Sequence, residues 1–344
     1  MLQHIYPHKP ILQLLIELGI NRATDATDRI VIILKSLHST DLPIAINTNM
    51  ARLTTEKEKQ DGPFLTQPIF QHVKFEHEDV IDIRYEHREV NGFRDQLTYN
   101  FVEILKSSYD LMTGYQDAKD LEDRIRIAKS PNRMTIEKWL TRFVVLESVA
   151  GIPGSVAGFL RHLRSIRSFK RDMGFIDTLY DEAFNERMHL LIFLKMSQPT
   201  KPTKALLWVG QGIFANMFFM TYIVSPKTCH RFVGYLEEEA VGTYTRCLED
   251  MDAGLCPELV NYPVPNIAKD YYHLEGEVTM YDLIQLIRAD EAKHREVNHT
   301  FANLELEGDD RNPFALQIGG NCHEPTKDLR WHHAAGWERD ELIL

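Results

Sequence analysis

Residues 284–302 read IQLIRADEAKHREVNHTFA, a stretch with helical periodicity that carries two Glu-x-x-His pairs. On a helix, residues three positions apart point within about 60° of each other, so such a pair can hold one metal ion. Glu291 and His294 continue a stripe of isoleucines in steps of three and four, which predicts that they face the core. Glu296 and His299 are rotated by about 140° from that stripe and follow polar residues. We expect the second pair to face solvent and reject it as a metal site.

A third such pair, Glu186 and His189, extends an apolar stripe that begins at Phe175. Two more glutamates occupy positions that belong to a core. Glu147 shares a helix face with leucine and valine side chains, and Glu237 shares one with valine, alanine and tyrosine. Four helical segments therefore each direct acidic residues inward.

Burying one ionised carboxylate costs several kcal/mol, roughly, and four that face each other require cations. A glutamate from each of two helices and a Glu-x-x-His pair from each of two others is the arrangement that binds two iron or manganese ions in a bundle core. Oxygen and imidazole donors suit those metals rather than a thiolate site. The alternative is a coincidence of buried or snorkelling glutamates. The predicted ligands are Glu147, Glu186, His189, Glu237, Glu291 and His294.

Three other residues are placed beside this site by spacing. Tyr244 lies seven residues after Glu237 and so on the same face. It is either a core tyrosine bonded to a carboxylate or a phenol that donates an electron or a proton near the metals. Asn185 and Asp290 each precede a ligand glutamate and are predicted to orient the histidine ligands through hydrogen bonds.

The chain as a whole is predicted to be all-α. Ile81, Ile83 and Tyr85 alternate with polar residues and predict one short strand, with no strand after Phe93. The predicted long helices cover residues 93–115, 134–165, 172–197, 203–225, 227–250 and 277–303.

Composition limits the function classes. The 344 residues carry a formal net charge of −11, which argues against a nucleic-acid-binding surface. Four cysteines, none in a CxxC pair, exclude a disulfide framework and a structural zinc site of the usual spacing. The first 24 residues fit neither a secretory signal nor a mitochondrial presequence well, so the import route stays open.

Membrane contact is indicated by two segments. Residues 205–226 contain no charge, and as a helix these 22 residues would be about 33 Å long, enough to cross a bilayer core. The alternative is a fully buried bundle helix. Residues 161–171 carry five Lys or Arg and no acidic residue. Such a run is either a solvated face or a surface for anionic lipid headgroups.

Four local sequences closely resemble the alternative oxidases, the membrane-bound di-iron quinol oxidases. These sequences are LESVAGIPG (146–154), NERMHLL (185–191), RFVGYLEEEAVGTYT (231–245) and RADEAKHREVNHTFA (288–302). Residues 87–115 resemble the first long helix of that family more loosely. The resemblance spans roughly 87–305, which leaves 1–86 as an N-terminal extension of unassigned role and 306–344 as a C-terminal tail.

The resemblance implies a ferritin-like four-helix di-iron bundle that is monotopic, with helices 93–115 and 203–225 lying flat in one leaflet. It implies an enzyme that oxidises ubiquinol and reduces dioxygen to water without haem, without proton pumping and without inhibition by cyanide. It further implies a homodimer at the inner membrane of a mitochondrion or a mitochondrion-derived organelle. Two iron ions would be bound by the six ligands already predicted.

The resemblance also implies roles for further residues. The quinol pocket would include Arg142, Leu146, Ala240 and Thr243 beside Glu237, and Tyr244 matches the tyrosine near the metals. His230 and Tyr272 stand at positions that the family also uses.

Two features depart from the family. No cysteine precedes Cys229, so the regulatory cysteines of the plant enzymes have no counterpart, and Phe184 stands where a glutamate is common. Two alternative functions stay open at this stage. One is a di-iron hydroxylase of quinone biosynthesis, and the other is a non-catalytic iron-binding membrane protein.

Overall fold

The computed structural model describes residues 50–55, 69–308, 310–315 and 325–342. Most of the predicted N-terminal extension and part of the tail, including Cys322, lie outside these residues. The other three cysteines are buried and unpaired.

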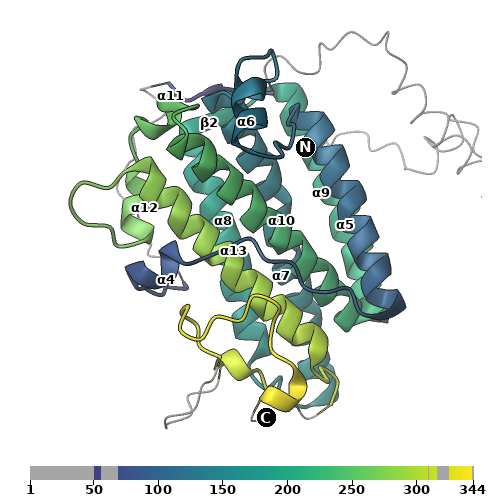
Figure 1. The fold of residues 1–344 in the computed structure, drawn as a ribbon. Coiled ribbons are helices and arrows are strands. Elements are labelled where there is room, and N and C mark those ends of the chain that lie inside the picture. Colours follow the sequence, from purple (N-terminus) through teal and green to yellow (C-terminus); the bar gives the residue numbers. More distant parts are fainter. Residues whose placement is uncertain (1–49, 56–68, 309, 316–324, 343–344) are drawn as a thin grey trace, which may run out of the picture. The chain divides into compact units, whose positions relative to one another are not determined.

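Four long helices form the bundle: α7 (Ile136–Ser168), α8 (Phe175–Met196), α10 (Pro226–Asp252) and α13 (Met280–Asn303). Figure 1 shows α5 (Gly92–Thr113) and α9 (Lys201–Val224) together on one side of it. The shorter helices are α4 (His77–Ile81), α6 (Leu121–Ala128), α11 (Pro257–Val260) and α12 (Asn266–Tyr271). The six long helices match the predicted ones to within three residues at each end, and the all-α class is confirmed.

Hydrogen-bonding residues at the helix starts and glycines at the contacts explain this arrangement. The hydroxyl of Thr135 accepts a bond from Lys138 N at the start of α7, and Thr279 forms a capping box at the start of α13. A Cβ on Gly154 of α7 would lie 2.5 Å from a backbone oxygen of α8, and one on Gly234 of α10 would lie 2.4 Å from His299 of α13. Both helix pairs therefore approach more closely than a side chain would allow.

The outer helices expose apolar side chains. α7 and α9 are both long and apolar enough to cross a membrane, but the most apolar window of α7 is 56% buried inside the bundle and that of α9 only 11%. On α9, Leu206, Val209, Ile213, Met217 and Met220 are exposed at steps of three and four residues. These side chains form one stripe on the helix face that points away from the bundle.

The strand predictions are wrong. The alternation read at 81–85 is not a strand, because α4 ends at Ile81 and irregular chain follows. Val80 and Ile83 are buried here while Ile81 and Tyr85 are exposed, so burial does not follow a period of two. A strand also occurs after Phe93: β2 (Ser197–Pro199) pairs antiparallel with β1 (Ala51–Leu53), and three residues are too few to show a period.

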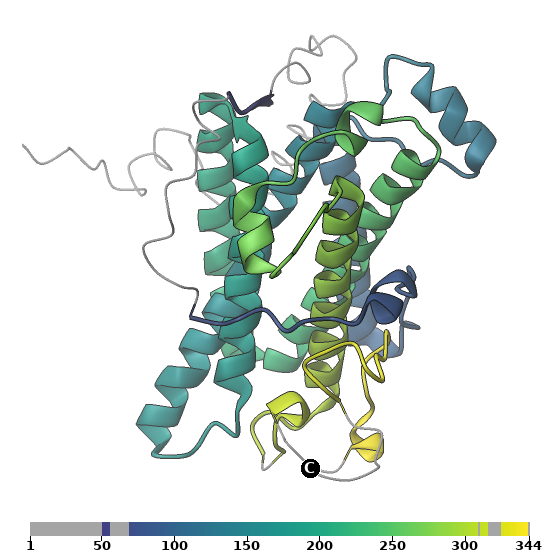
Figure 2. The same ribbon diagram turned by 90° about the vertical axis from the view of Figure 1, so that its left-hand side faces the viewer.

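The segments that precede α5 and follow α13 pack on the bundle. Figure 2 shows the segment from residue 69 to residue 91 crossing α13, with the C-terminal residues against the same helix. Short 3₁₀ turns at Pro313–Ala315 and Arg339–Glu341 shape the tail. These two segments cover faces of α10 and α13 that would otherwise meet solvent.

Candidate metal centre

The six predicted ligands meet in the bundle core. Within each of two groups the potential ligand atoms all lie within 4.8 Å of one another. The first group is Glu147, Glu186, His189 and Glu291, and the second is Glu186, Glu237, Glu291 and His294. Glu186 and Glu291 belong to both groups, so they lie where two neighbouring metal ions would share ligands.

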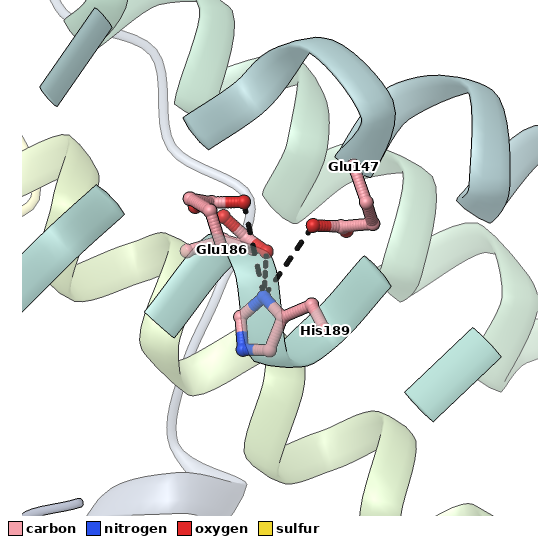
Figure 3. A group of neighbouring side chains, drawn as sticks. Glu147, Glu186 and His189 are labelled. Carbon is pink, nitrogen blue, oxygen red and sulfur yellow. Dashed lines mark ion pairs between the residues drawn. The ribbon is translucent and has the colours of Figure 1, made fainter. Parts of the chain in front are cut away.

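The side chains point at one another. Figure 3 shows Glu147 and Glu186 turned toward the ring of His189. His189 Nδ1 lies 3.5 Å from Glu147 Oε2 and 3.1 Å from Glu291 Oε1. His294 Nδ1 lies 2.6 Å from Glu186 Oε1. In each histidine the nitrogen that faces the carboxylates is therefore Nδ1.

Although these atoms lie close together, they do not satisfy one another. Seven buried atoms have no hydrogen-bond partner among the described residues: Glu147 Oε2, both carboxylate oxygens of Glu186 and of Glu291, and Nδ1 of His189 and of His294. A buried polar atom without a partner costs about 1–3 kcal/mol. Seven such atoms close together would destabilise an apolar core. They are oxygen and imidazole nitrogen atoms, which are the donors that bind iron or manganese cations.

The charges agree with this fit. Burial and the neighbouring carboxylates of Glu291 and Glu147 raise the pKa of Glu186 well above its usual value. Burial and Glu291 raise the pKa of Glu237 in the same way. Burial alone would lower the pKa of His294, yet the Glu186 carboxylate raises it well above its usual value. Each of these shifts favours the protonated form of its group, whereas bound divalent cations would favour the deprotonated form.

A hydrogen-bond network surrounds His189. Its Nε2 lies 3.0 Å from Asp290 Oδ2, and the same oxygen accepts from Asn185 Nδ2 at 3.0 Å and from the Tyr272 hydroxyl at 2.8 Å. Because an ionised carboxylate only accepts, His189 donates from Nε2 and leaves Nδ1 free for a metal. Asp290 thus holds the ring of His189 by a direct hydrogen bond, and Asn185 and Tyr272 hold Asp290 in turn.

The sequence profile of the family described as "Alternative oxidase" matches residues 75–303. The chain belongs to the alternative oxidase family.

Curated relatives agree with this assignment. "Alternative oxidase, mitochondrial" of Yarrowia lipolytica is 50% identical over 280 residues, which cover 81% of this chain and 78% of the relative. The protein of the same name from Scheffersomyces stipitis is 47% identical over 302 residues, 87% of this chain and 84% of the relative. That from Ajellomyces capsulatus is 47% identical over 310 residues, 86% of each chain.

In this alternative oxidase Tyr244 is fully buried, and its hydroxyl donates to Glu147 Oε1. The phenol is therefore in direct contact with one side of the carboxylate cluster. His230 lies differently: its ring nitrogens bond to the Tyr222 hydroxyl at 3.1 Å and to Asn298 Oδ1 at 2.9 Å. These bonds connect α10 with α9 and α13 rather than with a ligand.

The predicted quinol residues lie on α7 and α10. Arg142, Ala240 and Thr243 are buried, and Leu146 is partly buried. The guanidinium of Arg142 donates to Thr113 Oγ1 at 2.6 Å and lies 2.8 Å from Asp110 Oδ1. It also stacks 4.1 Å and 4.2 Å from the centroids of two tyrosine rings, Tyr109 and Tyr115. Sequence reasoning did not include these four partners of Arg142 from α5 and its end.

The prediction that Glu296 and His299 face solvent is wrong. Both are fully buried. Glu296 accepts from Trp337 Nε1 at 2.6 Å and bonds to His332 Nδ1 at 3.1 Å, so the C-terminal tail covers it. His299 Nε2 lies 2.9 Å from Glu238 Oε1. The pair is still no metal site, because its atoms are satisfied by hydrogen bonds.

Two polar residues near the predicted ligands were missed. His72 Nε2 lies 2.9 Å from Asp290 Oδ1, from a segment with no helical period. Glu182 lies one turn before Glu186 on α8 and is buried. The signal for Glu182 was present in the sequence, since it continues the stripe that leads to Glu186 and His189.

Proposed function

We propose that this chain is a ubiquinol oxidase that reduces dioxygen to water at a non-haem di-iron centre, is insensitive to cyanide and pumps no protons. The observation that carries the proposal is the set of unpartnered carboxylate and imidazole atoms in the core of a chain that belongs to the alternative oxidase family. The ligands would be Glu147, Glu186, His189, Glu237, Glu291 and His294, with each histidine binding through Nδ1.

Two iron ions, when bound by these ligands, would supply the electron transfer to dioxygen. The chain's own groups prepare the site for it. Asp290 holds the proton of His189 on Nε2, which keeps Nδ1 available as a ligand. Tyr244 holds its hydroxyl proton against Glu147, where it can be passed into the site. Burial of all these groups excludes bulk water.

We propose that ubiquinol binds beside Arg142, Leu146, Glu237, Ala240 and Thr243. Buried Arg142 supports this, because its charge is balanced by Asp110 while its face lies against tyrosine rings. The guanidinium of Arg142 can donate a hydrogen bond to a quinol oxygen in a pocket that is otherwise largely apolar.

We propose that α5 and α9 lie in one leaflet of the mitochondrial inner membrane, so that the protein is monotopic. On α5, exposed apolar residues include Phe93, Leu97 and Ile104, which are spaced to share a face. Phe232 of α10 contacts Phe101 of α5 and Phe214 of α9, so both helices pack on α10 with one face and expose the other. A helix that packs on the bundle with one face and exposes the other suits a flat position better than a span. A homodimer is proposed on the family resemblance alone.

The test is oxygen uptake by isolated membranes that carry the chain, with added ubiquinol and with cyanide present. We expect uptake that disappears in Glu186→Ala and persists in the matched variant Asp177→Ala, an exposed position on the same helix. No uptake by protein that holds two iron ions would contradict the proposal and favour a hydroxylase or an iron-binding protein without turnover. A hydroxylated product would identify the former.

A further inference from the structure

The proposed centre is closed on almost every side. Five of the predicted ligands are 0–2% exposed, whereas His294 is 6% exposed. A metal ion from solution therefore has its shortest way in beside His294. The opposite side of the bundle carries the apolar faces of α5 and α9, through which a hydrated dication would not pass.

A cavity of about 80 Å³ adjoins His294. Its outer part is lined by Asp181, which is partly exposed, and by Lys327, which is exposed, and their charged atoms lie 3.5 Å apart. Its inner part is lined by Glu182, Asn185 and His294. The cavity thus runs from charged groups at the surface to the one ligand that is not fully enclosed.

Glu182 is a buried carboxylate with no assigned task. Both of its oxygens accept from the same group, Asn298 Nδ2, at 2.9 Å and 3.0 Å, and it has no ion-pair partner among the described residues. Asparagine gives it one neutral donor where a buried carboxylate ordinarily requires a cation. Since Glu182 lies one helical turn from Glu186, a cation beside it would be a short step from the ligand cluster.

Asn185 provides a second, independent sign of a missing ligand. Its Nδ2 donates to the Tyr271 hydroxyl at 2.8 Å and to Asp290 Oδ2 at 3.0 Å. Because Asp290 only accepts, the amide cannot be turned round, and Oδ1 is the other atom. That oxygen is buried, has no partner among the described residues, and belongs to a side chain that lines the cavity.

We propose that this cavity is the route by which ferrous iron reaches the centre from the aqueous side. Asp181 attracts the ion at the mouth, Glu182 and Asn185 Oδ1 bind it in passage, and His294 with Glu186 receives it. Carboxylate and amide oxygens are suitable transient ligands for a hydrated dication. This inference rests on the proposed metal centre.

The experiment measures metal uptake rather than turnover. The full chain is stripped of metal in detergent and mixed anaerobically with Co²⁺, and visible absorption follows the rate while elemental analysis gives the number of ions bound. Glu182→Gln keeps the size and the oxygen that faces Asn298 but removes the charge. We expect uptake to slow about tenfold or more, with two ions still bound at the end.

Three further variants complete the design. Asp181→Asn is expected to slow uptake as well, and it stays informative if Glu182→Gln does not fold, because Asp181 is partly exposed. Lys327→Gln removes the positive charge at the mouth and is expected to speed uptake. Asp177→Asn, which makes the same change at an exposed site of α8 outside the cavity, is expected to leave the rate unchanged.

Each other outcome has a distinct meaning. Unchanged rates in both acidic variants, with two ions bound, would overturn the route and leave the proposed centre intact. Fewer ions bound to Glu182→Gln would make Glu182 a permanent ligand and overturn its role in passage. Slower turnover with normal uptake would make the cavity an exit for product water instead. Failure of the unmodified chain to bind two ions would refute the proposed function itself.

Discussion

Replacing Asp290 by leucine should weaken metal binding strongly, because this carboxylate fixes His189. In the structure Asp290 accepts from His189, Asn185 and Tyr272 with Oδ2 and bonds to His72 with Oδ1. Asn185 keeps its bond to a tyrosine and His72 is only partly buried, but His189 Nε2 and the Tyr272 hydroxyl each lose a buried acceptor. At about 1–3 kcal/mol for each unsatisfied group, the two together cost about 2–6 kcal/mol of folding free energy.

The effect on the metal follows from the freed imidazole. Without an acceptor at Nε2, His189 can turn or place its proton on Nδ1, and loss of such a partner typically costs about 10–100-fold in metal affinity. Asp290→Asn keeps one acceptor oxygen and is expected near the lower end of that range.

The assay combines chemical denaturation of the metal-free chain with titration by Co²⁺. Asp270→Leu, at an exposed position of α12, serves as control and should change neither quantity. Wild-type affinity for two ions in Asp290→Leu would refute the reasoning, since His189 would then be oriented by something other than Asp290.

Three more predictions concern single side chains. Tyr244→Phe removes the hydroxyl that donates to Glu147. Because the phenol is proposed to supply a proton, quinol-driven oxygen uptake should fall about 100-fold or more, while the iron content stays at the wild-type level. Unchanged uptake would remove Tyr244 from the mechanism. Gly234→Ala should destabilise the fold by about 1–3 kcal/mol, because the new methyl group meets the His299 ring. Gly210→Ala is the control, since no atom lies within 4 Å of its added Cβ. The denaturation midpoint should fall in the first variant and not in the second. Burial lowers the pKa of His230 in the folded protein to about 4. The contribution of this histidine to stability is therefore complete above its unfolded pKa of about 6.5. It is lost as the pH falls from there toward 4, by up to about 1.4 kcal/mol per pH unit. His230→Gln should flatten the stability curve in that window, and an unaltered slope would show that the ring is not held neutral.

The helices and the ligand positions could be predicted because both depend on one local period. Glu186 and Glu291 interrupt apolar stripes whose spacing fixes the face of the helix, and the long helices leave little freedom in how those faces meet. Their position on the stripe was sufficient to predict that both glutamates face the core, although their charge alone would have placed them on the protein surface.

Contacts made by irregular chain could not be predicted in this way. His72 contacts Asp290 from a segment without secondary structure, so no periodic pattern in the sequence predicts this contact. Phe184, where the resemblance leads us to expect a glutamate, has its ring centroid 5.4 Å from that of Phe70, which belongs to the same segment as His72. An aromatic side chain at 184 thus has a partner in a part of the chain that the family profile does not cover.

The error at Glu296 shows what decides burial on a polar helix face. Periodicity assigns this residue to solvent only if nothing else covers the helix, but Trp337, His332 and Lys293 surround its carboxylate with donors. Lys293 belongs to the same helix, whereas the other two come from the tail. A charged face that is matched by donors from distant chain becomes part of the core at little cost. The central carboxylates differ from Glu296 in this respect, since five of their oxygens, on Glu147, Glu186 and Glu291, have no donor among the described residues. Buried acids therefore indicate a metal centre only where the surrounding protein leaves them unpaired.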